Sequence, residues 1–173
     1  MILNTKQHEV ADTIVAHLGA YGQSILKAGL QTKADNIIAQ VINQTDFKEV
    51  CLFGRDYKHV MHVGNTWDRR TSVQYQKWPE LSPSHNVLIV IPDAFNVPHS
   101  YGIWLLAVAR GYHVIAYGSW GPEYDRVRDW PLAVSTNPEI VQAFNSWDLN
   151  PDFDIVRMRD NFPNSFDIAF GTF

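Results

Sequence analysis

The sequence predicts an α/β fold in which a mainly parallel β-sheet is flanked by helices. The first observation is the continuous apolar run from Val87 to Ile91, which is typical of a strand covered on both faces. The second is that an apolar helix, Ile103 to Ala109, and a further strand beginning at Val114 follow this run. Strand, helix and strand in this order form the repeating unit of a parallel sheet. We therefore expect a Rossmann-like (flavodoxin-like) architecture.

The loop between Val87–Ile91 and the following helix is the first place to look for a ligand site. Open parallel sheets bind ligands outside the carboxyl ends of their strands, which is where this loop falls. The helix is expected to end at Arg110 and Gly111, because glycine suits the left-handed residue after a helix. The polar or aromatic residues in the loop and at the helix start are Asp93, Asn96, His99, Ser100 and Tyr101.

Length and composition indicate one domain spanning residues 1–173. A chain of 173 residues with 46% hydrophobic content can bury a sizeable core without disulfide bonds. No repeat or low-complexity linker divides it. We expect an N-terminal helical segment over residues 1–46 and a sheet-containing part over residues 47–173.

Two extra helices are predicted before the first strand. Asn4 or Thr5 can cap a first helix, whose apolar stripe recurs at three and four residue intervals from Val10 to Leu26. Gly29 is expected near its end. The pattern Thr32 to Asp35 resembles the start of a second helix, which closes before the sheet begins.

The first strand is predicted at Val50 to Phe53, and the turn after it starts with Gly54 and Arg55. This turn follows the carboxyl end of a buried strand, so both residues are candidate ligand contacts. The segment after the turn, Tyr57 to Val63, alternates well enough to be a strand, and an antiparallel hairpin with the first strand is one interpretation.

The histidines of that segment argue against a metal site. On a strand, His59 and His62 would lie on opposite faces, because they are three residues apart. We therefore expect no metal and no cofactor.

The remaining elements are read more coarsely. Ser72 to Gln76 is a possible short strand, and Ser119 to Trp130 is a polar loop at the end of another strand. Val134 is expected in a further strand, a helix is expected from Asn137 to Ala143, and Phe166 to Phe173 closes the chain with several aromatic residues.

Charge and cysteine usage limit the possible functions. The formal net charge is −4, which argues against nonspecific nucleic-acid binding because such proteins need a basic field. Cys51 is a single cysteine in an apolar context, which favours a buried, unreactive side chain. No signal peptide or membrane-length apolar run is evident, and we expect a cytoplasmic protein.

From about Val87 to Phe173 the chain carries a series of short motifs in a recognisable order. They are Ile91-Pro92-Asp93 with Asn96-Val97, the helix ending Ala107 to Gly111, the strand Val114 to Tyr117, Trp130 to Asn137, Trp147 to Pro151, and Phe166-Asp167 with Gly171 and Phe173. Together they resemble the nucleoside 2-deoxyribosyltransferases and related nucleotide N-glycosidases. The resemblance implies a Rossmann-like fold and a nucleoside or nucleotide ligand.

The catalytic positions of that family are altered in this chain. There a glutamate in the first turn of the helix attacks the anomeric carbon, and an aspartate six residues earlier supports the base. Gly102 and Asn96 occupy these positions here, and a shift by one residue gives Ile103. None of the three side chains can replace a carboxyl group as a nucleophile or acid.

Other carboxylates and helix-start groups are then the candidate site residues. Asp93 and Glu123 are the candidate catalytic carboxylates. The helix start, with its backbone amides near Gly102 and the Ser100 hydroxyl, suits a phosphate or ribose oxygen. The resemblance also implies a homo-oligomer in which Arg128, Asp129 and the aromatic Phe173 complete a neighbouring subunit's pocket.

Three hypotheses follow. The first is a nucleoside or nucleotide-binding protein that is a divergent or catalytically altered member of this fold. The second is an active N-glycosidase or deoxyribosyltransferase that uses non-standard carboxylates. The third is an oligomeric interaction protein that retains only the fold.

Overall fold

The computed structural model describes residues 3–28, 33–54, 56–67, 73–94, 98–118 and 167–170. Its centre is a six-stranded sheet in which every strand pair is parallel. The strands are β1 (Gln23–Ala28), β2 (Glu49–Leu52), β3 (Val73–Tyr75), β4 (Val87–Pro92), β5 (His113–Gly118) and β6 (Asp167–Phe170). They lie in the order β3-β2-β4-β5-β1-β6. This arrangement confirms the predicted α/β, Rossmann-like fold.

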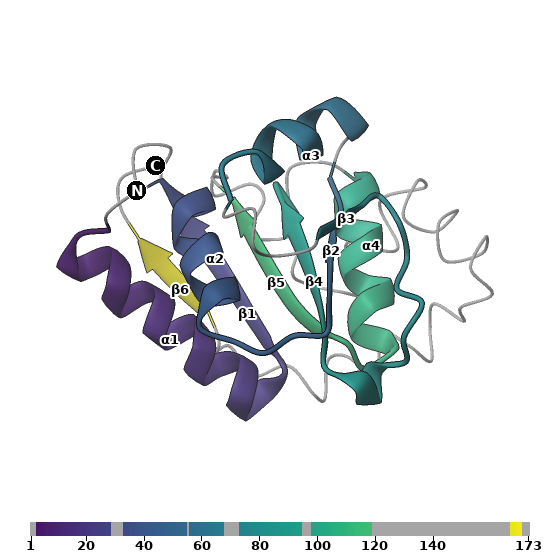
Figure 1. Cartoon of the computed structure of the whole chain (residues 1–173), viewed down its shortest axis with the longest axis horizontal. Coiled ribbons are helices and arrows are strands. Elements are labelled where there is room, and N and C mark those ends of the chain that lie inside the picture. Colours follow the sequence, from purple (N-terminus) through teal and green to yellow (C-terminus); the bar gives the residue numbers. More distant parts are fainter. Residues whose placement is uncertain are drawn as a thin grey trace.

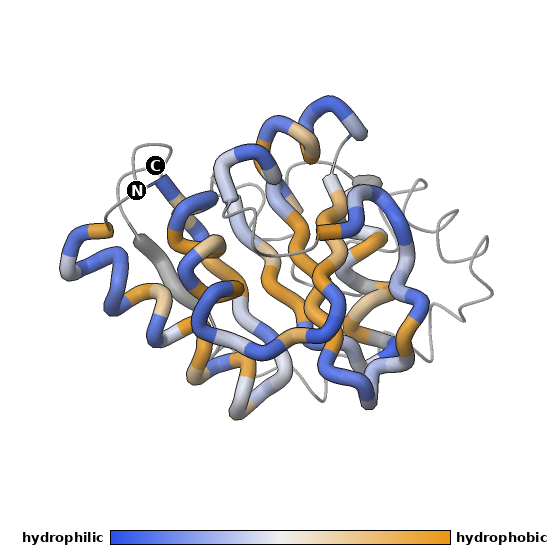
Figure 2. The backbone as a smooth tube through the Cα atoms, viewed as in Figure 1, coloured by the Kyte–Doolittle hydropathy of each residue, from blue (hydrophilic) through white to orange (hydrophobic). Residues whose placement is uncertain are grey.

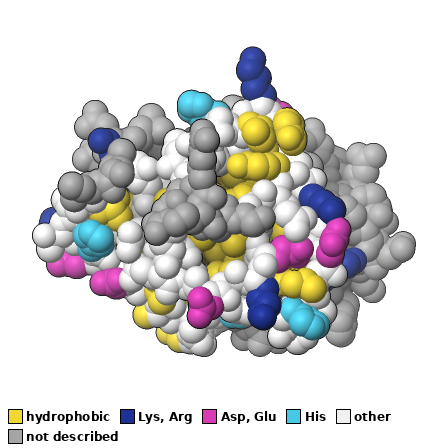
Figure 3. All heavy atoms as spheres, in the orientation of Figure 1, with side chains coloured by type: hydrophobic (Ala, Val, Ile, Leu, Met, Phe, Trp, Pro, Cys, Tyr) yellow, Lys and Arg dark blue, Asp and Glu magenta, His cyan; other side chains and the backbone are white. Residues whose placement is uncertain are grey.

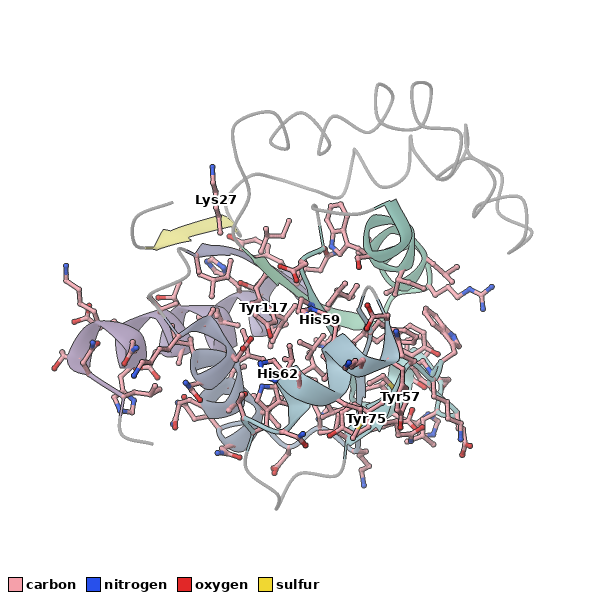
Figure 4. The ribbon with its side chains drawn as sticks, turned by 90° about the horizontal axis from the view of Figure 1, so that it is seen from above. Lys27, Tyr57, His59, His62, Tyr75 and Tyr117 are labelled. Atoms are coloured by element: carbon pink, nitrogen blue, oxygen red, sulfur yellow. The ribbon has the colours of Figure 1, made fainter. Side chains whose placement is uncertain are left out.

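Helices cover both faces of the sheet (Figure 1). They are α1 (Thr5–Tyr21), α2 (Ala34–Asn43), α3 (Tyr57–Gly64) and α4 (Pro98–Ala109). Figure 4 views the molecule from above and shows α1, α2 and α3 on one side of the sheet and α4 on the other. A short 3-10 turn, Pro83–His85, precedes β4.

The core between the sheet and α1, α2 and α3 is built by alternate strand residues. Leu88 and Val90 of β4 point into it, as do residues of β1, β2 and β5. The intervening residues, such as Ile89 and Ile91, point to the α4 side and are also fully buried. Every position of β4 is buried, which accounts for its unbroken apolar run in Figure 2.

The N-terminal segment differs from the prediction. The first helix ends at Tyr21, where Gly22 adopts a left-handed conformation (φ 72°) and its N–H donates to the Leu18 carbonyl. The following residues form β1, which pairs with β5 and β6. Residues 1–46 are therefore not purely helical, and the stripe that was predicted to reach Leu26 continues as a buried strand.

The segment from Tyr57 is also not a strand. The side chain of Asp56 accepts a hydrogen bond from the His59 backbone N–H at 2.7 Å and caps α3. The hairpin interpretation is wrong, because a helix connects β2 to its parallel neighbour β3. On this helix His59 and His62 lie on the same side rather than on opposite faces.

Strands β2, β3, β4 and β5 lie where they were expected, and Gly111 is left-handed (φ 82°) after α4. Helix α4 begins at Pro98 rather than Ile103, so His99, Ser100 and Tyr101, which were predicted in the loop, belong to the helix. Strand β6 lies within the predicted closing segment. The expected loop, strand and helix over residues 119–143 lie outside the described residues.

The strand order creates a crevice between β2 and β4. The chain leaves β2 through α3 on one face of the sheet, whereas it leaves the adjacent β4 through α4 on the other face (Figure 4). Strands β3, β2, β4 and β5 thus have the 2-1-3-4 order that begins a flavodoxin-like sheet. Such a change of direction opens space at the carboxyl ends of the two strands, where ligands bind.

On the face shown in Figure 3, acidic and basic side chains of the described residues are interspersed. No helix within the described ranges combines the length and apolar character needed to cross a bilayer.

Gly19, which lies in the first helix, and Gly22, which follows it, provide a test of where this helix ends. We expect Gly22→Ala to lower the free energy of unfolding by about 1–2 kcal/mol, because a side chain is disfavoured in the left-handed conformation. Gly19→Ala is the matched control. It lies in the helix with open space around it and should raise stability by about 0.5–1 kcal/mol. Urea denaturation measures both, and equal effects would contradict the assigned helix end.

Candidate ligand pocket

A pocket of about 230 Å³ lies at the carboxyl edge of the sheet. Its walls come from the ends of β1, β4 and β5, the start of α2, and α3. The lining residues are Ala28, Lys33, Ala34, Asp35, His59, His62, Val63, Pro92, Asp93, Tyr117 and Gly118. Figure 4 shows His59, His62 and Tyr117 gathered in this region, away from Tyr57 and Tyr75.

Asp93 is held in the pocket wall by its own backbone. Its N–H donates to the Tyr117 carbonyl at 2.7 Å, which extends the pairing of β4 with β5 by one residue. Its backbone is left-handed (φ 54°), an unusual conformation that aspartate tolerates better than most residues. A Cβ on Gly118 would lie 3.1 Å from the Asp93 Cα. The glycine therefore allows the two strand ends to approach this closely.

His59 reaches Asp93 across the crevice between β2 and β4. Its Nε2 lies 3.0 Å from the Asp93 Oδ2, and the two side chains are 19% and 35% exposed. The contact has ion-pair distance, but its alignment is not that of a hydrogen bond. Helix α3 thus places an imidazole beside a carboxylate that directly follows β4.

Gly54 sets the position of that imidazole. A Cβ at Gly54 would lie 2.5 Å from the Val60 Cγ1 and 3.3 Å from the His59 Cδ2. The Gln76 side chain accepts from the Gly54 N–H at 3.2 Å and donates to its carbonyl at 3.0 Å, which fixes this turn. Gly54 was predicted to contact a ligand, but it does not line this pocket and instead packs beneath α3.

Asp35 and Tyr117 form a buried pair on the opposite wall. The Tyr117 hydroxyl donates to the Asp35 Oδ1 at 2.5 Å. Burial raises the pKa of Asp35, and the nearby Asp93 charge adds to this, whereas the Tyr117 hydrogen bond and the two histidines oppose it. Burial and then the Asp35 charge raise the pKa of Tyr117 well above its usual value. Tyr117 therefore stays protonated and serves as a permanent donor.

The other residues that were predicted to form the site lie in helix α4 or outside the described residues. Ser100 is fully buried in α4, and its Oγ has no hydrogen-bond partner in the part of the chain described. Gly102 is buried in the same helix. His99 and Tyr101 belong to α4, but their side chains lie outside the description. The remaining predicted site residues lie outside the described residues: Arg55, Asn96, Glu123, Arg128, Asp129 and Phe173.

Of the residues that line the pocket, sequence reasoning named only Asp93 as a site residue. The spacing of Asp56 and His59 is that of a helix cap, and it would have placed His59 and His62 on one helical face. Asp35 and Tyr117 gave no local signal, because their contact joins residues far apart in the chain. Only the order of the strands in the sheet brings Asp35 and Tyr117 close together.

The side chains that line the pocket are suited to binding a polar ligand. It offers two carboxylates, two imidazoles and the Lys33 amine to a ligand. Within the described ranges no group of three or more His, Cys, Asp or Glu side chains is arranged to hold a metal ion.

Fold and pocket together define a Rossmann-like α/β protein with a polar pocket at the carboxyl edge of its parallel sheet. Neither a known protein family nor a curated protein matches the chain.

The burial of Asp35 leads to a pH-dependent prediction. A carboxyl group with a raised folded-state pKa binds its proton more tightly in the folded state, so stability falls as pH rises from about 4 through the folded pKa. Asp35→Asn removes this loss. We expect it to raise the free energy of unfolding at pH 7 by roughly 1 kcal/mol.

Urea denaturation between pH 3 and pH 8 checks this result. The advantage of Asp35→Asn should shrink below about pH 4, where Asp35 is neutral in both states. The matched control is Asp46→Asn, because Asp46 is exposed. This control should stay within about 0.5 kcal/mol of the wild type throughout. A constant difference at every pH would show that Asp35 titrates normally.

Gly54→Ala tests the packing of α3. The new methyl group would overlap the Val60 side chain, so we expect a loss of stability of about 1–3 kcal/mol. The His59 ring should also move relative to Asp93. A shift in the His59 imidazole resonances in NMR spectra measures this movement, and unchanged stability and resonances would contradict the tight packing.

Proposed function

We propose that this protein binds a nucleoside or nucleotide at the carboxyl edge of its sheet, as a divergent member of the deoxyribosyltransferase-like fold. The observation that carries the proposal is the position of Asp93. The sequence placed this residue in a ligand loop, and its carboxylate lines a pocket with Asp35 and His59. The pocket adjoins the β2–β4 crevice, which is the usual ligand position in sheets of this order.

The pocket chemistry supports a sugar-containing ligand. Carboxylates that follow strands of Rossmann-like sheets commonly accept hydrogen bonds from ribose hydroxyls. The imidazoles of His59 and His62 can donate or accept, according to their tautomer. A partly buried site with few placed polar groups is typical of small-molecule recognition.

A second candidate is turnover of the same ligand. It is favoured by two carboxyl groups in different surroundings, one on the buried Asp35 and one on the more exposed Asp93. Cleavage of a glycosidic bond uses such a pair, one as acid and one to stabilise the anomeric centre. In this candidate Asp35 is the acid and Asp93 stabilises the anomeric centre. Glu123, the other catalytic carboxylate proposed from the sequence, lies outside the described residues. A protein that keeps only the fold as an oligomeric interaction partner is the third hypothesis.

Calorimetry with the full chain tests the proposal. The probes are the four common ribonucleosides, their 2′-deoxy counterparts and their 5′-monophosphates, with chromatography of each mixture for released base. We expect saturable heat with at least one probe, and Asp93→Asn should weaken that binding about 10- to 100-fold because a charged acceptor is lost. Asp46→Asn is the control and should bind as the wild type does.

The outcomes separate the three hypotheses. Saturable heat without free base supports binding alone, whereas free base that disappears in Asp93→Asn supports turnover. No heat with any probe would overturn the proposal and favour the interaction protein. Light scattering on the same samples measures whether the chain forms the proposed homo-oligomer.

A further inference from the structure

The two carboxylates of the pocket come from different parts of the chain and face one cavity. Asp35 belongs to the first turn of α2, and Asp93 follows β4. Both residues line the same cavity of about 230 Å³, so their carboxylates lie near one another. A ligand in this cavity therefore meets two acceptors at once.

We propose that these two carboxylates bind the vicinal hydroxyls of a ribose and that the site thereby selects ribose over 2′-deoxyribose. This inference rests on the proposed nucleoside or nucleotide binding. It assigns the sugar, rather than the base or the phosphate, to the pocket.

The Asp35 carboxylate uses one oxygen within the protein and leaves the other for a ligand. Its Oδ1 accepts from the Tyr117 hydroxyl, and Tyr117 is only 3% exposed, so this bond is shielded from water. No other hydrogen bond to the Asp35 carboxylate occurs among the described residues. The second oxygen is thus free to accept from a ligand while Tyr117 holds the carboxylate in one orientation.

The two oxygens of the Asp93 carboxylate have different neighbours among the described residues. Its Oδ2 lies against His59, whereas its Oδ1 would be 3.3 Å from a Cβ on Gly118. Because residue 118 is glycine, no Cβ at that position crowds this oxygen. The absence of a Cβ leaves room for a ligand hydroxyl beside Oδ1.

Lys33, His59 and His62 also line the pocket, but the space between the two carboxylates favours a hydrogen-bond donor over an anion. Carboxylates accept hydrogen bonds and repel anions, so a phosphate is disfavoured between Asp35 and Asp93. A vicinal diol supplies two donors on adjacent carbons. The volume of about 230 Å³ is smaller than the roughly 300–1,000 Å³ of drug-sized sites, and it has room for the sugar ring of a nucleoside.

A 2′-deoxy sugar leaves one of the two acceptors without a donor. Hydrogen bonds to charged groups contribute about 1.5–3 kcal/mol, which corresponds to about a 10- to 150-fold difference in affinity. A site built to bond a hydroxyl rejects the analogue that lacks it, because a desolvated polar group is left unpaired.

Calorimetry on matched pairs of ligands tests this inference. For each nucleoside that binds, the probes are the ribonucleoside, its 2′-deoxy form, its 3′-deoxy form and the free base. We expect the ribonucleoside to bind at least 10-fold more tightly than either deoxy form. Asp35→Asn and, independently, Asp93→Asn should reduce this ratio to below about 3-fold, whereas Asp46→Asn should keep it. Circular dichroism confirms that each variant is folded, and two variants are used so that one unfolded protein does not decide the result.

Each outcome has a defined meaning. Equal affinity for the ribo and 2′-deoxy forms overturns the sugar selectivity and leaves the proposed binding intact. A free base that binds as tightly as its nucleoside shows that the pocket takes the base, which also overturns the inference alone. No binding by any probe overturns the proposed function and the inference together.

Discussion

The hydrogen bond from the Asp93 N–H to the Tyr117 carbonyl is the contact on which the site depends. It adds one more rung to the β4–β5 ladder at the place where both strands end. The register of this ladder is fixed by strands that are buried on both faces, and a slip by one residue would turn every side chain to the wrong side. The core therefore determines where the Asp93 carboxylate lies. The left-handed backbone of Asp93 is then tolerated because the surrounding sheet leaves it no alternative.

The polar groups that line the pocket also lower the stability of the folded protein. A carboxyl group placed in a poorly solvated position disfavours its charged form, and Asp35 shows this in its raised pKa. The Tyr117 hydroxyl and the nearby imidazoles offset part of the cost without removing it. Apolar side chains would pack there at no such cost, so the polar set is better explained by recognition than by folding.

The sequence predicted the part of the fold in which local and global signals agree. The unit from Val87 to Gly118 was recognisable because a doubly covered strand, an apolar helix and Gly111 each have a distinct pattern. Strand β1 was missed because Ile25 and Leu26 continue the helical spacing of α1, and its pairing partners lie far away in the chain. Likewise, the alternation in Tyr57 to Val63 fitted a strand, and only the capping contact of Asp56 decides for a helix. At the site, the strand-end rule found Asp93, whereas Asp35 depends on tertiary pairing.

Strand β1, which the sequence did not predict, changes which residues reach the pocket. Because β1 inserts beside β5, its end and the start of α2 reach the edge where β4 and β5 terminate. The N-terminal segment, expected as two added helices, thus supplies Asp35 to the pocket. The loop after β4 lacks the family's two carboxyl groups, yet the pocket holds two that come from different elements. The two positions that match the family's catalytic carboxyl groups, Asn96 and Gly102, carry no acid. The side chains of Asp35 and Asp93 instead make this edge of the sheet an acidic pocket, and this is the basis on which a ligand site is proposed.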